Sequence, residues 1–445
     1  MTTSTRFLFC CAICLTLGGA SQIRAQSSSP AKKRPVDAAS RELDRLLRDA
    51  QDAVNKQDYD TAAKDYEQYL QKKPDDASAH YNLGYVYTAL ERPEDAKTEY
   101  AKAIALAPSD PQMAPAYQNL GVTLLPNDPA AAVDPLQHAA DMQPQDAHVK
   151  WLLGTALERS GKVPAAIEQF QAAQKLDSKD VDIASSLAYA LLNAGRFADA
   201  EATYRAELAL HPEDIALKQA HLGLANSLVA QKKLDEAAAE FGAYLELAPS
   251  DTAVRIERAS TLVDLGKNDD ALAELDRAAS AGPENLRALK LRSQLYWEMK
   301  RYDEAVPVLE KAAALAPNDP NILDRLGRVY LAKKDYPNAL RWLVAAYKLS
   351  PDANDLLAQV IEAEYLNKNY AETLAGLDIL SKRQELPAAS WYVRATCFDK
   401  LGQIQPALDA YQKFLQLNKD ENSDMYFVST SRVRTLTREL KDKTR

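Results

Sequence analysis

The sequence contains little of what disulfide-rich, low-complexity or β-sheet proteins require. Its 445 residues include 4 Cys, 14 Gly and 22 Pro, and only 7% are aromatic. So few Gly and Pro exclude a low-complexity chain, and no stretch alternates apolar and polar residues for long enough to form a sheet. Ala, Leu, Lys, Glu, Asp and Gln are abundant, and 47% of the residues are hydrophobic. This composition predicts a folded, mainly helical protein with a large core.

Long hydrophobic runs are also missing, except near the N-terminus. Arg6 precedes an apolar run at residues 7–17, which is followed by small residues and by possible cleavage sites after Ala20 and Ala25. This order is typical of a secretory signal peptide. The alternative is a membrane anchor, but a spanning helix needs roughly 20 apolar residues. We therefore predict that the chain is exported, either to a periplasm or out of the cell.

The predicted cleavage also decides the cysteine chemistry. Removing the signal peptide, residues 1–25, leaves Cys397 alone in the chain, so no intramolecular disulfide is expected. Cys397 lies in an apolar helical stretch and is interpreted as a small buried side chain. The other Cys residues lie inside the apolar run, and we expect no lipid anchor. Residues 26–42 are polar, contain Pro and lack periodicity, which predicts a disordered linker.

Charge and motifs exclude several classes of function. The net charge is −9 and the one strongly basic stretch is residues 32–34, so we do not expect a nucleic-acid partner. The His residues are His80, His138, His148, His211 and His221. None stands at metal-ligand spacing from another His or Cys, and we expect no metal or cofactor. Phosphate-binding Gly loops, GxSxG and HExxH are absent from the sequence, which predicts a protein that is not an enzyme.

Two columns of residues recur along the chain. The first is the Pro of phrases such as "ALAPSD", at Pro74, Pro108, Pro144, Pro212, Pro249, Pro283, Pro317 and Pro351. The second, the Ala column, stands twelve residues earlier and comprises Ala62, Ala96, Ala132, Ala166, Ala200, Ala237, Ala271, Ala305 and Ala339, continued by Thr373 and Ala407. The usual spacing is 34 residues. A fixed period of this length indicates stacked supersecondary units.

A third column, the small-residue column, falls in the preceding helical stretch of each unit. Its members are Gly84, Gly121, Gly154 and Gly327, with Ala50, Ala188, Ala225, Ala259 and Ala395 in other units. Small residues let two helices approach closely, so this column and the Ala column predict the contacts within a helical hairpin. The Pro ends the second helix, and the Asp that follows caps the next unit.

These columns resemble the tetratricopeptide repeat. The best copy is residues 77–110, and its matching residues are Leu83, Gly84, Tyr87, Ala96, Tyr100, Ala103 and Pro108. The resemblance covers about residues 43–422. It implies an all-α, right-handed superhelical solenoid of about eleven antiparallel helix hairpins. Residues 423–445 have helical character and are predicted to cap the last hairpin.

The resemblance also implies a function, because the first helices of such hairpins line a concave groove that holds a partner protein or an extended peptide. We take the groove positions mainly as one residue after and two residues before the small-residue column. They are Asn82, Tyr85, Asn119, Trp151, Tyr189, Asn226, Gln294, Arg325 and Arg328. The prediction is a non-enzymatic interaction scaffold of the cell envelope.

Alternatives to this interpretation remain open. Each groove residue could belong to an ordinary solvated helix surface. The chain could instead be a structural component that forms homo-oligomers by stacking its terminal repeats, or an enzyme with an unrecognised site. One family variant holds a C-terminal carboxylate with Lys and Asn. Lys290 and Gln294 are followed here by Arg325, so we do not expect that role.

Some units depart from the pattern. The third and sixth carry three extra residues before the first helix, which predicts a longer turn or an added helical step. The tenth has Ile361 and Thr373 at its two small positions, so the register there is the weakest part of the prediction.

Overall fold

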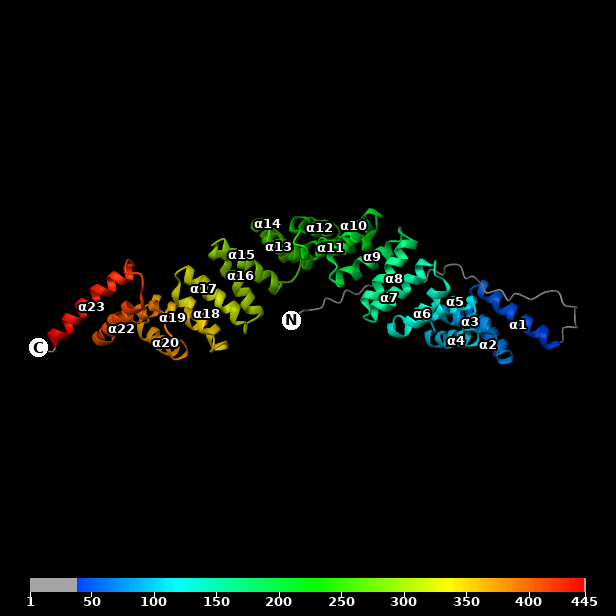
Figure 1. The fold of residues 1–445 in the computed structure, drawn as a ribbon, viewed down its shortest axis with the longest axis horizontal. Coiled ribbons are helices and arrows are strands. Elements are labelled where there is room, and N and C mark those ends of the chain that lie inside the picture. Colours follow the sequence, from blue (N-terminus) through cyan, green and yellow to red (C-terminus); the bar gives the residue numbers. More distant parts are fainter. Residues whose placement is uncertain (1–37, 444–445) are drawn as a thin grey trace. The chain divides into compact units, whose positions relative to one another are not determined.

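The computed structural model describes residues 38–443, which form two compact units of consecutive α-helices (Figure 1). The first unit ends at Gln231 and the second begins at Lys232. The first contains α1 (Ala38–Asn55), α2 (Tyr59–Lys72), α3 (Ala77–Ala89), α4 (Pro93–Leu106), α5 (Ala114–Leu124), α6 (Pro129–Met142), α7 (Ala147–Arg159), α8 (Val163–Leu176), α9 (Val181–Asn193), α10 (Phe197–Ala209) and α11 (Asp214–Ala230). The second contains α12 (Leu234–Leu247), α13 (Thr252–Asp264), α14 (Asn268–Ala281), α15 (Leu286–Glu298), α16 (Tyr302–Leu315), α17 (Pro320–Ala332), α18 (Tyr336–Leu349), α19 (Asn354–Leu366), α20 (Tyr370–Arg383), α21 (Ala388–Lys400), α22 (Ile404–Leu417) and α23 (Asp424–Lys443).

Within each unit, successive helices pack as hairpins. In the first unit α1 pairs with α2, and the pattern continues to α9 with α10, while α11 packs against α10. In the second unit α12 packs against α13, and pairs run from α13 with α14 to α21 with α22. Residues 38–443 contain no β-strand. The predicted all-α architecture of tandem hairpins is confirmed, while the right-handed sense and the number of repeats stay predictions.

The Ala column lies inside the hairpins. All of its members, Thr373 included, are 0% exposed. The small-residue column faces a large side chain of the second helix, because a Cβ on Gly84 would lie 2.7 Å from Tyr100, and one on Gly154 would lie 2.6 Å from Phe170. Side chains do not approach this closely in packed interiors, so a larger residue at either Gly would overpack its hairpin. The predicted close helix contacts are confirmed.

The turn inside most hairpins contains one residue with a left-handed backbone. Gly161 and Gly195 adopt φ of 82° and 73° in the α7–α8 and α9–α10 turns. Glycine has no Cβ to clash in this conformation. Other hairpins place residues with a Cβ there, for example Glu91 and Lys300, each with φ of 56°. Those turns are therefore strained relative to the turns that contain glycine.

The junctions between hairpins follow the predicted pattern of Pro and Asp. The Asp76 side chain accepts a hydrogen bond of 3.0 Å from the backbone N–H of Ala79 and caps α3. The Asp146 side chain accepts a 3.0 Å hydrogen bond from Val149 N–H in the same way and caps α7. Each cap satisfies one of the backbone donors that the first turn of a helix leaves unpaired.

The departures from the repeat have structural counterparts. The extra residues of the third unit form a 3₁₀ turn at Pro111–Met113, and those of the sixth lengthen α11 to 17 residues. In the tenth unit the sizes are exchanged. A Cβ on Gly376 of α20 would lie 2.6 Å from Ile361 of α19, so the small residue stands on the second helix and the large one on the first.

The two ends of the described chain differ from the repeats. Helix α1 begins at Ala38, so residues 38–42 are helical and do not belong to the linker predicted for 26–42, because Ala, Arg and Glu favour helix. The predicted signal peptide lies outside the described residues. At the other end, α23 packs on the last hairpin through buried Leu436. Arg432 also donates to both carboxylate oxygens of Asp399, at 2.6 and 2.7 Å.

Candidate peptide-binding face

The predicted groove residues lie on the first helices of the hairpins, and we call the surface that these helices form within each unit the first-helix face of that unit. The first unit contributes Asn82, Tyr85, Asn119, Trp151, Tyr189 and Asn226, from α3, α5, α7, α9 and α11. The second contributes Gln294, Arg325 and Arg328, from α15 and α17. Asn226 and Arg328 are exposed and the others are half-buried. These side chains are therefore placed partly at the surface and partly between neighbouring helices.

The asparagines of α3 and α5 connect one hairpin to the next. Asn119 Nδ2 donates to the hydroxyl of Tyr100 on α4 at 3.4 Å. Asn82 hydrogen-bonds the hydroxyl of Tyr66 on α2, while burial raises the pKa of Tyr66 to about 12. Both tyrosines are fully buried, and their hydroxyls also contact Gln51 Oε1 at 3.4 Å and Thr88 Oγ1 at 2.9 Å, so each asparagine adds a second partner to a buried hydroxyl.

Tyr85 and Trp151 also make contacts within the first unit. Tyr85 hydrogen-bonds Tyr59 of α2. Trp151 Nε1 donates to Ser186 Oγ of α9 at 2.9 Å, and its ring lies 5.3 Å from that of His148. Tyr85 thus links its first helix to the preceding second helix, and Trp151 links two first helices; both side chains are half-buried.

Tyr189 and Asn226 converge on a cavity of about 70 Å³ between α9, α10 and α11. Its lining residues are Ser185, Tyr189, Leu192, Tyr204, Glu207, Gln219, Leu222, Gly223 and Asn226. A Cβ on Gly223 would overlap the Tyr204 ring, so only glycine lets α11 approach α10 this closely. The structure thus brings together two predicted residues that are far apart in sequence.

Glu207 in the wall of this cavity is a residue that the sequence analysis missed. It is 0% exposed, and its Oε1 accepts a hydrogen bond of 2.5 Å from Ser185 Oγ. Its Oε2 has no hydrogen-bond partner among the described residues. Burial raises the pKa of the Glu207 carboxyl to about 7. The sequence does distinguish Glu207, because it stands seven residues after the Ala column, where the three preceding units have Ala.

A second cavity on the first-helix face, of about 340 Å³, lies in the second unit. Its lining residues are Ser260, Arg287, Lys290, Leu291, Ser293, Gln294, Leu309, Asn321, Ile322 and Arg325. Its basic side chains have polar partners. Lys290 pairs with Asp319 at 2.8 Å and holds the pKa of that carboxyl below its ordinary value. Arg287 pairs with Glu257 on α13.

The predicted residues around this cavity also make polar contacts. Gln294 Nε2 donates to Glu298 Oε1 at 2.9 Å, and an Arg325 guanidinium N–H donates to the backbone oxygen of Lys290 at 3.5 Å. Arg328 lies outside the cavity lining, with its guanidinium 5.8 Å from the Trp297 ring. This part of the face carries cations whose charges are largely balanced by carboxylates.

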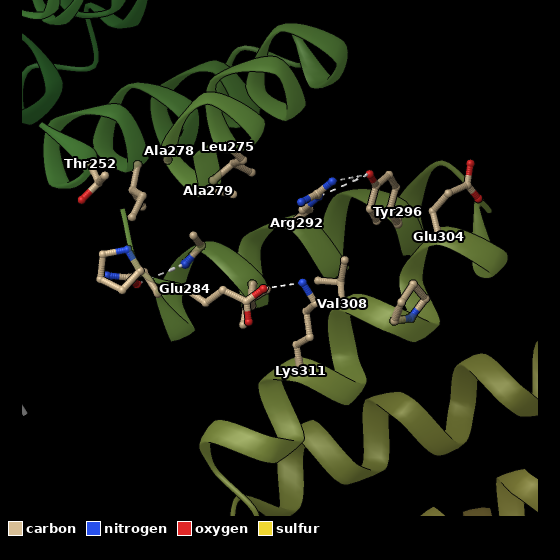
Figure 2. Close-up of a pocket in the computed structure, with 16 residues that line it drawn as sticks. Thr252, Leu275, Ala278, Ala279, Glu284, Arg292, Tyr296, Glu304, Val308 and Lys311 are labelled. Carbon is tan, nitrogen blue, oxygen red and sulfur yellow. Dashed lines mark hydrogen bonds and ion pairs between the residues drawn. The ribbon is translucent and has the colours of Figure 1, made fainter. Parts of the chain in front are cut away.

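The second helices of the same unit border a third cavity, of about 410 Å³, between α13, α14, α15 and α16 (Figure 2). Its walls are largely apolar, with Leu275, Ala278 and Val308 among the residues drawn. Glu284 and Lys311 form an ion pair along one side, and Arg292 contacts the Tyr296 hydroxyl on the other. None of the predicted groove residues lines this cavity.

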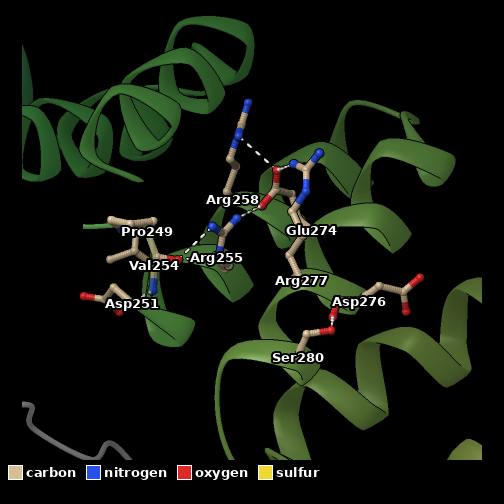
Figure 3. A network of polar contacts seen from close by, with 9 residues as sticks. All are labelled: Pro249, Asp251, Val254, Arg255, Arg258, Glu274, Asp276, Arg277 and Ser280. Carbon is tan, nitrogen blue, oxygen red and sulfur yellow. Dashed lines mark hydrogen bonds and ion pairs between the residues drawn. The ribbon is translucent and has the colours of Figure 1, made fainter. Parts of the chain in front are cut away.

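A cluster of polar contacts holds α13 to α14, where three guanidinium groups converge on Glu274 (Figure 3). Glu274 is 3% exposed and accepts from Arg255 at 2.8 Å, Arg258 at 3.0 Å and Arg277 at 2.6 Å. Arg255 also donates to the backbone oxygen of Pro249 at 2.8 Å. Both oxygens of this buried carboxylate are therefore satisfied, which makes the cluster a structural contact.

The described residues also bear on membrane insertion, metal binding and thiol chemistry. Across residues 38–443, no helix combines the length and apolar character that crossing a bilayer requires. No group of three or more His, Cys, Asp or Glu side chains in that range could hold a metal ion. Cys397 is buried, and burial raises the pKa of its thiol to about 11. A thiol in this environment is a poor nucleophile at neutral pH.

Comparison with known proteins gives a consistent result. Family models described as tetratricopeptide repeat match residues 47–111, 127–181, 185–252, 256–320, 296–360 and 388–421. No curated protein matches the chain.

Several solved structures resemble it. Yeast Tom70 is 14% identical over 90% of this chain and 96% of its own, with a TM-score of 0.33. A tetratricopeptide repeat protein from Parabacteroides merdae is 16% identical over 59% and 98%, with a TM-score of 0.39. The pilF protein of Pseudomonas aeruginosa is 22% identical over 46% and 93%, with a TM-score of 0.37. At these identities the likeness concerns the fold alone.

Proposed function

We propose that this chain, which belongs to the tetratricopeptide repeat family, is a non-enzymatic scaffold in which each unit binds an extended segment of a partner protein along its first-helix face. One observation carries the proposal. In each unit a cavity lies between first and second helices at predicted groove residues, Tyr189 and Asn226 in the first and Gln294 and Arg325 in the second. Cavities with both apolar and hydrogen-bonding walls suit the side chains and amides of an extended peptide.

Export to the cell envelope belongs to the same proposal. It rests on the predicted signal peptide at residues 1–25. An interaction scaffold outside the cytoplasm requires no ATP or redox cofactor, which agrees with the absence of phosphate-binding and HExxH motifs from the sequence. End-to-end stacking into homo-oligomers is less favoured at the C-terminal end, because α23 packs over the last hairpin there.

Selection from a displayed library of random twelve-residue peptides tests the proposal. The purified chain is the bait, and dissociation constants of enriched peptides are measured by fluorescence anisotropy. We expect the double variant Tyr189→Ala, Gln294→Ala to bind the enriched peptides at least about tenfold more weakly, a loss of about 1.4 kcal/mol.

The matched control is Gln68→Ala, Glu168→Ala, which removes two exposed side chains from second helices. It should leave binding unchanged. Failure to enrich any peptide, or equal losses in both double variants, would show that the first-helix face is not the binding surface.

A further inference from the structure

Glu207 occupies a position that the three preceding repeats fill with a small apolar residue. Seven residues after the Ala column stand Ala103, Ala139 and Ala173, all completely buried. Glu207 at the matching place is also completely buried. A carboxyl in this environment loses its hydration, so it destabilises the fold unless another group compensates it. Because Ala serves the packing at this place in the three preceding repeats, the acid here is a candidate for a functional role.

The hydrogen bonding of Glu207 is incomplete. Ser185 Oγ donates to Oε1, but Oε2 accepts nothing from the described residues. Glu274, the buried carboxylate of the second unit, has three arginines around it. Glu207 therefore retains a strong acceptor that a ligand can use, whereas Glu274 does not.

The cavity beside Glu207 has the lining expected of a site for a cation. Tyr189 and Tyr204 contribute aromatic rings, and Asn226 contributes an amide at the exposed side. No Lys, Arg or His is among the described residues that line it. Aromatic rings attract ammonium and guanidinium groups through their faces, and a buried carboxylate provides the opposite charge.

The size of the cavity limits what can enter. A volume of about 70 Å³ admits a terminal ammonium or guanidinium group or a few water molecules, but not a large side chain. Gln219 and Leu222, at the α11 side, are only half-buried. Because Glu207 itself is covered, a ligand reaches Oε2 by displacing part of this lining.

We infer that this cavity is an anchor site for a Lys or Arg side chain of the segment bound along the first-helix face, with Glu207 as its counter-ion. The inference rests on the proposed function. The cationic group donates a hydrogen bond to Glu207 Oε2 and lies between the two tyrosine rings. The aliphatic part of the Lys or Arg side chain passes Leu222 and Asn226 toward the backbone of the bound segment. The first unit would then select partner segments with a basic residue at one fixed position.

The first experiment uses n-butylammonium, a mimic of the Lys side chain, and n-butanol as its uncharged twin. The readout is the ¹³C chemical shift of the Glu207 carboxyl, assigned by the loss of its signal in Glu207→Gln. We expect saturable shifts with n-butylammonium only. Equal responses to both probes, or none to either, would overturn the inference, because the cavity would then hold water or any small polar molecule.

The second experiment uses the peptides enriched by the selection described above. Replacing each Lys or Arg in turn with norleucine should weaken binding about tenfold at one position, the effect expected for a charge-assisted contact. In Glu207→Gln the same replacement should change binding by less than about twofold. Glu168→Gln, which neutralises an exposed acid of α8, should behave like the native chain.

The outcomes separate the two proposals. If peptides bind but no position shows this dependence on Glu207, the anchor site is wrong and the scaffold proposal stands. If n-butylammonium binds but no peptide is enriched, the cation site stands and the peptide-binding proposal falls.

Discussion

The hairpins α7–α8 and α9–α10 are neighbours built on the same columns, yet they differ at a pair of positions, one on each helix. In α7–α8, Ala173 of α8 is completely buried, and Trp151 of α7 stands three residues before the small-residue column. In α9–α10, Glu207 replaces the Ala and Ser185 replaces the Trp. Ser185 donates to Glu207, and a cavity adjoins it. The change from Ala to Glu on the second helix is therefore accompanied by a change from Trp to Ser on the first.

The largest expected effect comes from moving the acid into the wrong hairpin. Ala173→Glu would bury a carboxyl where Trp151 replaces the hydroxyl donor and Trp151 Nε1 is already bonded to Ser186. We expect the free energy of unfolding to fall by about 3–5 kcal/mol, because a buried charge and an overpacked core both destabilise. Urea unfolding followed by circular dichroism measures this. Glu168→Ala on the exposed side of α8 is the control, and equal stability of the two variants would contradict the comparison.

Neutralising Glu207 in its own hairpin should raise the free energy of unfolding. The pKa of Glu207 is about 7 in the folded chain against an ordinary value of 4.5, so the folded state holds the proton more tightly. The free energy of unfolding therefore falls as the pH rises from about 4.5 to 7 and stays low above that range. We expect Glu207→Gln to be more stable than the native chain by about 1–3 kcal/mol at pH 8, and by less than about 1 kcal/mol at pH 5.

Other groups near Glu207 titrate as well, and the paired measurement separates them. Asp182 on α9 and Tyr204 on α10 interact with Glu207, and α11 presents Gln219 and Asn226, which do not titrate. Burial also raises the pKa of Glu158 on α7, which interacts with Tyr204, to about 7. All of these remain in Glu207→Gln, so the difference in pH dependence from the native chain reports Glu207. Equal pH dependence of the two chains would mean that Glu207 does not carry the shift.

Removing the Ser185 hydroxyl tests whether the change from Trp to Ser on the first helix supports Glu207. Ser185→Ala deletes the hydrogen bond that lowers the Glu207 pKa, so that pKa should rise further. We expect a loss of about 1–2 kcal/mol of unfolding free energy at pH 8, and less than about 1 kcal/mol when Glu207→Gln is also present. A double-mutant cycle by urea unfolding gives the coupling. Additive losses would show that the two side chains act independently.

The smallest effect tests whether the two hairpins are otherwise alike. Gly161 and Gly195 occupy the same left-handed turn position, and neither has a close neighbour that a Cβ would clash with. Gly161→Ala and Gly195→Ala should each cost about 1 kcal/mol, because only the backbone conformation penalises the new side chain. Unequal losses in thermal unfolding would reveal a further difference between the hairpins.

Most of the fold could be predicted because each repeat column records a local contact. Each member of the Ala column, like Gly84, makes its contact within its own hairpin, where spacing along the sequence decides which residues meet. Contacts between hairpins were harder to predict. Asn82 and Asn119 are predicted on the groove surface, yet both also bond tyrosines of the preceding second helix, because α3 packs against α2 and α5 packs against α4.

Glu207 shows why the site was only partly predicted. Tyr189 and Asn226 were named from their register, but the cavity between them depends on Gly223 and on the longer α11. A search for catalytic or metal-binding residues passes over a lone acid in an amphipathic helix. Comparing the repeats position by position would have found it, since Glu207 is the first acid after three units that bury Ala at the same place.

In the tenth hairpin the large residue, Ile361, lies on the first helix and the small one, Gly376, on the second. This arrangement limits which helices of the chain can be exchanged between hairpins. A graft of α19 alone onto another second helix would bring Ile361 against a side chain with no gap for it, and a graft of α20 alone would leave a void at Gly376. Transferred together, the two helices carry their own complementarity. The smallest interchangeable module of this chain is therefore the whole hairpin, and shuffling libraries should be cut at the turns between hairpins.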